Sequence, residues 1–230
     1  AKAEQILSII KLPTAPQIDG NAAEWGANWQ NVAVKPAREN DDKNTVGDMQ
    51  VQLQAAVVGD EFYLVARWPD TEADTEYRPW QWKGKKYKRG RSYDDMFAVR
   101  FDMGGDYNAC MVADADYKVD TWLWSAGRSD EKGYATDGYH IITLDLLTDA
   151  AEYQTPSGKT VYIKKWQDEG VAGFENIRPG KKKTESTLPS ISFPGTPTGS
   201  IADVSAKGQW QDGFWTVEFK RKLTTGHLDD

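Results

Sequence analysis

Residues 49–68 constrain the fold more than any other part of the chain. Val51, Leu53 and Ala55 alternate with glutamines in the first half, and the second half resumes a period of two after a Gly-Asp pair at 59–60. A period of two is typical of a strand that is buried on one face, and Gly-Asp favours a tight turn between two such strands. We therefore predict an antiparallel strand pair here.

Further strand-like segments follow along the chain, at residues 95–103, 118–128, 159–166 and 214–223. In the second of these, Val119, Thr121 and Leu123 share one face, and Trp122 and Trp124 share the other. Short connections rich in Gly, Asp and Pro separate the segments, and no long amphipathic helix stands out. The pattern predicts an all-β fold, an antiparallel β-sandwich with long irregular loops and a few short helical turns.

The length of 230 residues is suited to one domain, and we predict a single domain over residues 1–230. Two charged or Pro- and Gly-rich segments interrupt the strand pattern, at about 69–95 and 170–200. We expect both to be long irregular loops, which in compact domains are often functional.

Charge and composition exclude several classes of protein. The net charge of −7 argues against nucleic acid as a partner, and no apolar run is long enough for a membrane span. The single cysteine excludes an internal disulfide and leaves the redox compartment open. The start, AKAEQILS, is compatible with a mature N-terminus left by signal-peptide cleavage, which predicts an exported or periplasmic protein.

Few residues are suited to catalysis. The chain has two histidines, and it lacks the common motifs of serine hydrolases, zinc sites and dinucleotide-binding folds. A haem-binding site needs an apolar slot and soft axial ligands. Met103 at the end of a strand and Met111 in the loop after it could project toward such a slot, and Cys110 beside Met111 is a further candidate ligand. Composition alone favours a packing role for each methionine.

Five stretches, in this order, resemble the ethylbenzene dehydrogenase-type haem-binding domain. They are DGNAAEWGANW, DEFYLVARWPD, RPWQWKGKKYKRGRSYDDMFAVRFDM, VDTWLWSAGRSDEKGYATDG and GFWTVEFKRKLTTGHLDD. The family includes the gamma subunits of periplasmic molybdenum oxidoreductases, such as the ethylbenzene, dimethyl sulfide, selenate, chlorate and nitrite enzymes, and also related c-type cytochromes.

The resemblance implies a β-sandwich that binds one haem, b-type in the gamma subunits, with a methionine and a lysine as axial ligands. The methionine window contains Met103 and Met111, and we favour Met111 because it lies in the loop ahead of the Trp-x-Trp strand. The lysine region gives Lys220 first and Lys222 second. A lysine that binds iron must be neutral, and burial against haem would favour that state.

The c-type relatives carry a two-cysteine attachment motif in the same window, which this chain lacks. Cys110 could still form a single thioether bond, which would make the haem c-type, or it could be a ligand. Trp122 and Trp124 share a strand face and are candidates for the wall of the haem pocket, where aromatics would exclude water. Their alternative role is in the core of the fold.

The resemblance implies an electron-transfer subunit that catalyses no substrate reaction itself. Its partners would be the iron–sulfur and molybdenum subunits of an oxidoreductase complex and a soluble electron carrier, to which an acidic surface could dock. Two alternatives stay open. One is a cofactor-free carbohydrate-binding module with Trp80 and Trp82 as its platform, and the other is a subunit that uses the same lysine-flanked tryptophans as a protein interface.

Overall fold

The computed structural model describes residues 6–35 and 48–227, and it is all-β. No α-helix occurs in these ranges, and the helical turns are three short 3-10 helices, η1 (Ala22–Trp25), η2 (Asp130–Lys132) and η3 (Ser200–Ala202). The prediction of an all-β fold with a few short helical turns is confirmed. Among the described residues there is no helix of the length and hydropathy that a membrane crossing requires. The predicted mature N-terminus begins at residues 1–5, which lie outside the described ranges.

The chain divides into two compact units. Unit 1 combines Ala1–Asp74 with Ser205–Leu223, and unit 2 combines Thr75–Val204 with Thr224–Asp230. Unit 2 is therefore inserted into the sequence of unit 1.

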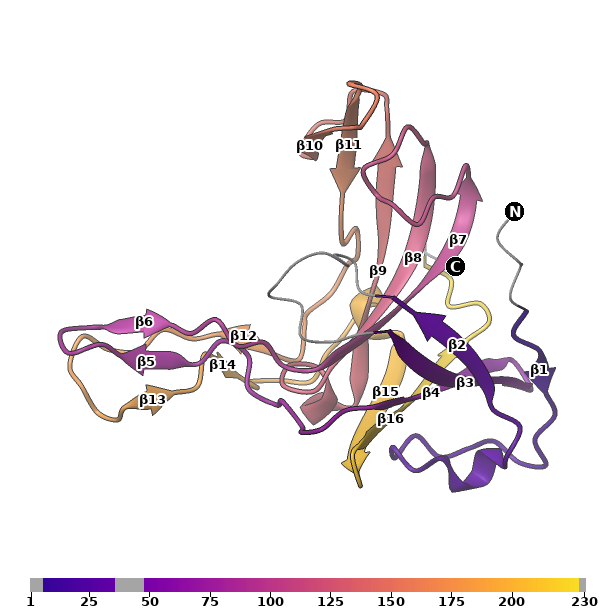
Figure 1. Cartoon of the computed structure of the whole chain (residues 1–230), viewed down its shortest axis with the longest axis horizontal. Coiled ribbons are helices and arrows are strands. Elements are labelled where there is room, and N and C mark those ends of the chain that lie inside the picture. The colour runs from indigo at the N-terminus through magenta and orange to yellow at the C-terminus, as the bar shows by residue number, and fades with distance from the viewer. Residues whose placement is uncertain (1–5, 36–47, 228–230) are drawn as a thin grey trace. The chain divides into compact units, whose positions relative to one another are not determined.

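Unit 1 is built on antiparallel strands, which are labelled in Figure 1. The hairpin predicted at 49–68 is present, and its second strand pairs with the last strand of the chain. One short strand pairs in parallel, β1 with β3. The strands are β1 (Ile9–Ile10), β2 (Gln30–Val34), β3 (Met49–Val58), β4 (Glu61–Pro69), β15 (Val204–Gln211) and β16 (Phe214–Lys222).

A buried carboxylate joins the two sequence segments of unit 1. Glu218 on β16 is fully buried, and its Oε1 accepts a 2.7 Å hydrogen bond from the Trp25 indole. Its Oε2 accepts from the backbone N–H groups of Asp19, at 3.0 Å, and Gly20, at 2.8 Å. Burial raises the pKa of Glu218, although these donors oppose the shift. The DGNAAEW stretch is thus anchored to the last strand.

Unit 2 contains an antiparallel sheet in the order β7-β8-β9-β11-β10. Its strands are β7 (Met96–Gly105), β8 (Tyr117–Ser125), β9 (Tyr134–Thr143), β10 (Ala151–Gln154) and β11 (Thr160–Lys164). An apolar cluster lies on one face of it, formed by Ala115, Tyr117, Val119, Ile142, Val161 and Ile163.

The two segments predicted as long irregular loops contribute short strands that pair with one another. β5 (Trp80–Trp82) and β6 (Tyr87–Arg89) form a hairpin, and β13 (Thr187–Leu188) pairs with β5. β12 (Glu175–Asn176) pairs with β14 (Ile191–Ser192). Figure 1 shows these strands along an extended arm of unit 2.

Candidate functional site

Three polar side chains gather on one face of the β7-β8-β9 sheet. The register places Arg100 opposite Thr121 and Thr121 opposite Gly138, and in the next row Val119 lies opposite His140. Directly paired residues point to the same side of a sheet, so Arg100, Thr121, Val119 and His140 share one face, which we call the Thr121 face. The apolar cluster of unit 2 lies on the same face, because Val119 belongs to both.

The polar atoms of the Thr121 face are buried and unpartnered. Thr121 is 4% exposed and His140 is 5% exposed. Within the described ranges, Thr121 Oγ1, both ring nitrogens of His140, and Nε and Nη2 of Arg100 are buried without a hydrogen-bond partner. An unpaired buried polar group costs about 1–3 kcal/mol. Five such atoms on one face therefore indicate a place for a bound polar group, one that offers acceptors to the Arg100 guanidinium.

His140 is held neutral in this setting. Burial, together with the positive charges of Arg100 and Lys165, lowers its pKa from 6.5 to about 4. The Trp166 ring packs edge-on against the imidazole, with 4.8 Å between centroids. A group whose pKa falls on folding binds fewer protons when folded, so its contribution to stability is complete above pH 6.5 and is lost as the pH falls toward 4.

We expect His140 to make the protein less stable in mild acid. The free energy of unfolding should fall by up to about 3 kcal/mol between pH 6.5 and 4 through His140, because one pKa unit corresponds to about 1.4 kcal/mol. Urea unfolding at pH 7 and pH 4.5 measures this loss. His140→Gln should lose that component, whereas His227→Gln should keep it. Equal pH dependence in wild type and His140→Gln would contradict the assignment.

The loop between β7 and β8 carries Met111. Its ends are closed by a 2.9 Å hydrogen bond from Asp106 N–H to the Asp116 carbonyl. Gly105 permits this closure, since its φ is +104° and a Cβ there would lie 2.3 Å from the same carbonyl oxygen. Inside the loop, the Tyr117 hydroxyl donates to the Asn108 carbonyl at 2.8 Å. Met111 packs against the apolar cluster, so it lies on the Thr121 face.

The other two candidates near this loop have different surroundings. Cys110 is exposed, and its backbone N–H donates to the Asn108 side chain at 2.9 Å. Met103 lies at the β-bulge of β7, where the register shifts between Asp102 and Gly104. Cys110 and Met111 are therefore neighbours in one loop, while Met103 belongs to the strand before it.

Trp122 and Trp124 lie on the opposite face of the sheet from Met111. They alternate with Thr121 and Leu123, as predicted from the sequence, and both are buried. Trp122 packs on Phe101 with 4.7 Å between ring centroids. The Trp124 indole donates to Asp130 at 2.8 Å. A haem that touched Met111 on the Thr121 face would have these tryptophans behind the sheet.

The lysine candidates belong to unit 1. Lys220 on β16 is 33% exposed, and its Nζ lies 3.0 Å from Glu61 Oε1. The hydrogen bond from Tyr63 and the ion pair with Lys220 lower the pKa of Glu61. Burial, together with the bond to Glu61, raises the pKa of Tyr63 to about 12. Lys222 is exposed and shares the face of Lys220. Either lysine would have to be neutral to bind iron.

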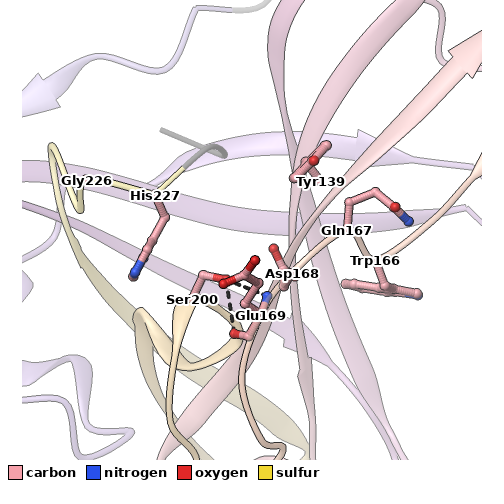
Figure 2. A pocket seen from close by; sticks show the side chains of 8 residues that line it. All are labelled: Tyr139, Trp166, Gln167, Asp168, Glu169, Ser200, Gly226 and His227. Carbon is pink, nitrogen blue, oxygen red and sulfur yellow. Dashed lines mark hydrogen bonds between the residues drawn. The ribbon is translucent and has the colours of Figure 1, made fainter.

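A polar pocket of about 440 Å³ also occurs in unit 2 (Figure 2). Ser200 exchanges hydrogen bonds with the backbone of Glu169, which accounts for the dashed lines in the figure, and His227 pairs with Asp203. The lining contains neither methionine nor lysine, so it is not suited to the predicted haem ligands. It consists of Tyr139, Trp166, Gln167, Asp168, Glu169, Ser200, Gly226 and His227.

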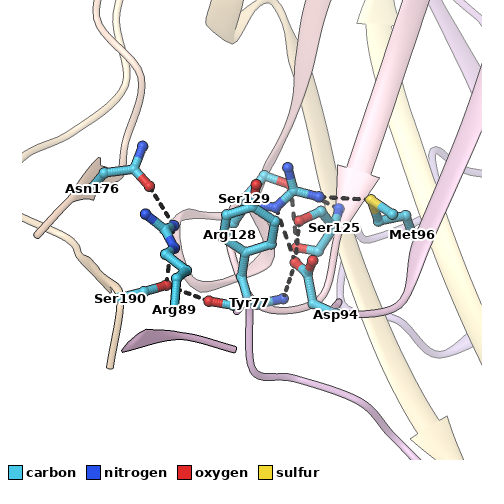
Figure 3. Close-up of polar contacts among 10 residues, drawn as sticks. Tyr77, Arg89, Asp94, Met96, Ser125, Arg128, Ser129, Asn176 and Ser190 are labelled. Atoms are coloured by element: carbon cyan, nitrogen blue, oxygen red, sulfur yellow. Dashed lines mark hydrogen bonds and ion pairs between the residues drawn. The ribbon is translucent and has the colours of Figure 1, made fainter. Parts of the chain in front are cut away.

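A buried carboxylate clasps the start of β7 to the turn after β8 (Figure 3). Asp94 accepts hydrogen bonds from the Ser125 hydroxyl at 2.5 Å, the Gly127 N–H at 3.0 Å and Arg128 Nε at 3.2 Å. The Arg128 guanidinium also lies over the Tyr77 ring, 4.4 Å from its centroid. The DDM and WSAGRSD stretches of the sequence are thus held together at the base of the arm.

Residues 25–230 match the family model described as ethylbenzene dehydrogenase. The chain belongs to the ethylbenzene dehydrogenase family. None of the curated proteins matches it. The ethylbenzene dehydrogenase family is one of haem-binding domains and suggests a subunit of an oxidoreductase complex.

The Thr121 face fits the cofactor of the ethylbenzene dehydrogenase family. A haem offers two carboxylates to a cation such as Arg100, and a flat apolar ring to side chains such as Val119 and Ile142. It accepts a thioether sulfur such as that of Met111. The orphaned buried donors of Arg100 are the observation on which this fit rests.

Sequence reasoning missed Arg100, Thr121 and His140 as a group. One signal was available, since Arg100 interrupts an otherwise apolar stretch and His140 is one of two histidines in the chain. Each is separated from the next by about twenty residues, so only the strand register brings them to one face.

Proposed function

We propose that this chain is the haem-containing electron-transfer subunit of a periplasmic molybdenum oxidoreductase complex. The observation that carries the proposal is the Thr121 face, where Arg100, Thr121 and His140 keep unpartnered buried polar atoms. Met111 packs against the apolar cluster of the same face. Buried donors without acceptors are costly, so a bound group that satisfies them would stabilise this face.

Each residue has a stated role in this proposal. Met111 would hold the haem iron through its sulfur, and Arg100 would pair with a haem carboxylate. The apolar cluster excludes water, which favours the less charged state of the cofactor. Lys220 stays the predicted lysine ligand, with Lys222 as its alternative. When bound, the haem would act as a one-electron carrier.

Membership of the family supports the partners of this proposal. Electrons would pass between an iron–sulfur subunit and a soluble carrier, and the substrate would react on the molybdenum subunit rather than on this chain. The haem is b-type in this proposal. Cys110 is exposed in the same loop as Met111, so one thioether bond to a haem vinyl group is the competing c-type form.

The test is an absorption spectrum of the purified protein, oxidised and dithionite-reduced, followed by acid–acetone extraction. A Soret band and a sharp reduced alpha band with extractable haem are expected. Haem that stays with the protein after extraction would indicate attachment at Cys110. The absence of a Soret band after expression with sufficient haem would overturn the proposal and favour the cofactor-free binding module.

A further inference from the structure

The arm of unit 2 has a charge opposite to that of the chain. We define the basic arm as residues 76–93 together with 175–192, the two segments that contain β5, β6, β12, β13 and β14. It holds 11 of the 28 Lys and Arg residues of the chain. Of the 35 Asp and Glu residues it holds 3, namely Glu76, Glu175 and Glu185. The arm therefore carries a net charge of +8, and the rest of the chain carries −15.

Most of these cations face solvent without a carboxylate partner. Nine are exposed, and none of the nine makes an ion pair within the described ranges. This differs from Lys159 and Lys220, which pair with Asp114 and Glu61. The nine are Lys83, Lys85, Lys86, Lys88, Arg91, Arg178, Lys181, Lys182 and Lys183.

The arm presents the cations on an ordered scaffold. The Tyr87 hydroxyl donates to the Glu185 carbonyl at 2.7 Å, which ties the β5–β6 hairpin to the second segment. Arg89 donates to Asn176 at 2.7 Å and lies over the Trp80 ring, 5.4 Å from its centroid. Figure 3 shows Arg89 between Asn176 and Ser190. Because these contacts fix the backbone in advance, a partner would lose less entropy on binding than with a flexible tail.

A hollow of about 380 Å³ lies among the cations. Trp80, Tyr87 and Pro179 give it apolar surface, and Lys85, Lys86, Arg178 and Lys181 line it with positive charge. Aromatic and apolar surface ringed by cations is suited to a peptide that carries carboxylates next to an apolar side chain.

We propose that the basic arm is a docking surface for an acidic segment of a partner protein. The carboxylates of the segment pair with the lysines around the hollow, and a neighbouring apolar side chain enters it. The rest of the chain carries a net charge of −15, which would repel an extended nucleic acid or a flat anionic membrane. A short acidic segment can contact the arm alone. The proposal rests on the arm and does not require haem to be bound.

The experiment measures binding of the full chain to a fluorescein-labelled twelve-residue peptide of glutamates with one central leucine, by fluorescence anisotropy at 50 mM salt. The test variant is Lys85→Glu with Lys86→Glu. The matched control is Lys11→Glu with Lys118→Glu, which changes the net charge equally at exposed lysines outside the arm. We expect the arm variant to bind roughly tenfold more weakly and the control to stay within about twofold of wild type.

Several results would overturn the proposal. Absence of binding to the wild-type chain at 50 mM salt is one, and equal weakening in the two variants is another, because it would leave only net charge. Tighter binding of single-stranded DNA of equal charge, or of phosphatidylglycerol vesicles, would overturn the choice of a protein partner. All substituted lysines are exposed, so thermal unfolding should be unchanged in both variants.

Discussion

Met111→Ala is expected to weaken haem retention by roughly tenfold or more and to change the reduced absorption spectrum. The side chain is the thioether in the loop 106–116 that packs on the Thr121 face. Without its sulfur, the iron would lose a ligand that the rest of this loop cannot replace in kind. Spectra of the reduced protein and transfer of haem to apomyoglobin measure the two effects.

Two further variants separate ligation from packing. Met111→Leu keeps the apolar contact with the cluster and removes the sulfur, so it should resemble the alanine variant in its spectrum but not in its stability. Met103→Ala is the matched control for the other predicted methionine. If Met103→Ala changes the spectrum and Met111→Leu does not, Met103 is the ligand. Lys220→Ala and Lys222→Ala provide the same comparison on β16.

Asp94→Ala is expected to lower the free energy of unfolding by about 3–5 kcal/mol. The substitution removes the acceptor of three donors, from Ser125, Gly127 and Arg128, and Asp94 is 2% exposed. Arg128 would keep its charge in a largely buried place without its carboxylate. Urea unfolding at neutral pH measures the loss.

The control for this prediction is Asp106→Ala, an exposed carboxylate of the same unit, which should change the free energy of unfolding by less than about 0.5 kcal/mol. Asp94→Asn keeps the shape and one acceptor, so it should lie between the two. The clasp also anchors the base of the arm, and trypsin should therefore cut the arm faster in Asp94→Ala. A stability equal to that of Asp106→Ala would show that the clasp contributes little.

Strands with a clear period of two could be predicted from the sequence. The hairpin at 49–68 corresponds to β3 and β4, and the segment 214–223 corresponds to β16. In each, apolar side chains alternate along the strand, and this local pattern places them on one face of the sheet. The opposite faces of Thr121 and Trp122 were predictable for the same reason.

β9 was not predicted because its sequence contains Asp137-Gly138, which usually indicates a turn. In the structure Gly138 lies in mid-strand, where a Cβ would be 2.2 Å from Asp168 Oδ2 and 2.6 Å from Trp166 Cε3. Because glycine has no Cβ, Trp166 and Asp168 of a later segment can approach β9 closely at this position. Such a contact is long-range, and no local pattern contains it.

The candidate site was predictable only in part. Met111 could be proposed from its place in a loop and from the family resemblance. The grouping of Arg100, Thr121 and His140 depends on the register of three strands, which pairs residues far apart in the sequence. Sequence alone likewise could not show that the two long segments, expected to be irregular, pair to form the arm.

The insertion of unit 2 into unit 1 has a consequence for synthesis on the ribosome. Residues 1–74 emerge early, but β16, which pairs with β4 and buries Glu218 against Trp25, emerges only after residues 75–204 of unit 2. Most of unit 2 is contiguous and can fold before that, since domains generally fold as they are completed. Until β16 arrives, the nascent chain exposes the unpaired edge of β4, a template for aggregation that a chaperone would have to cover.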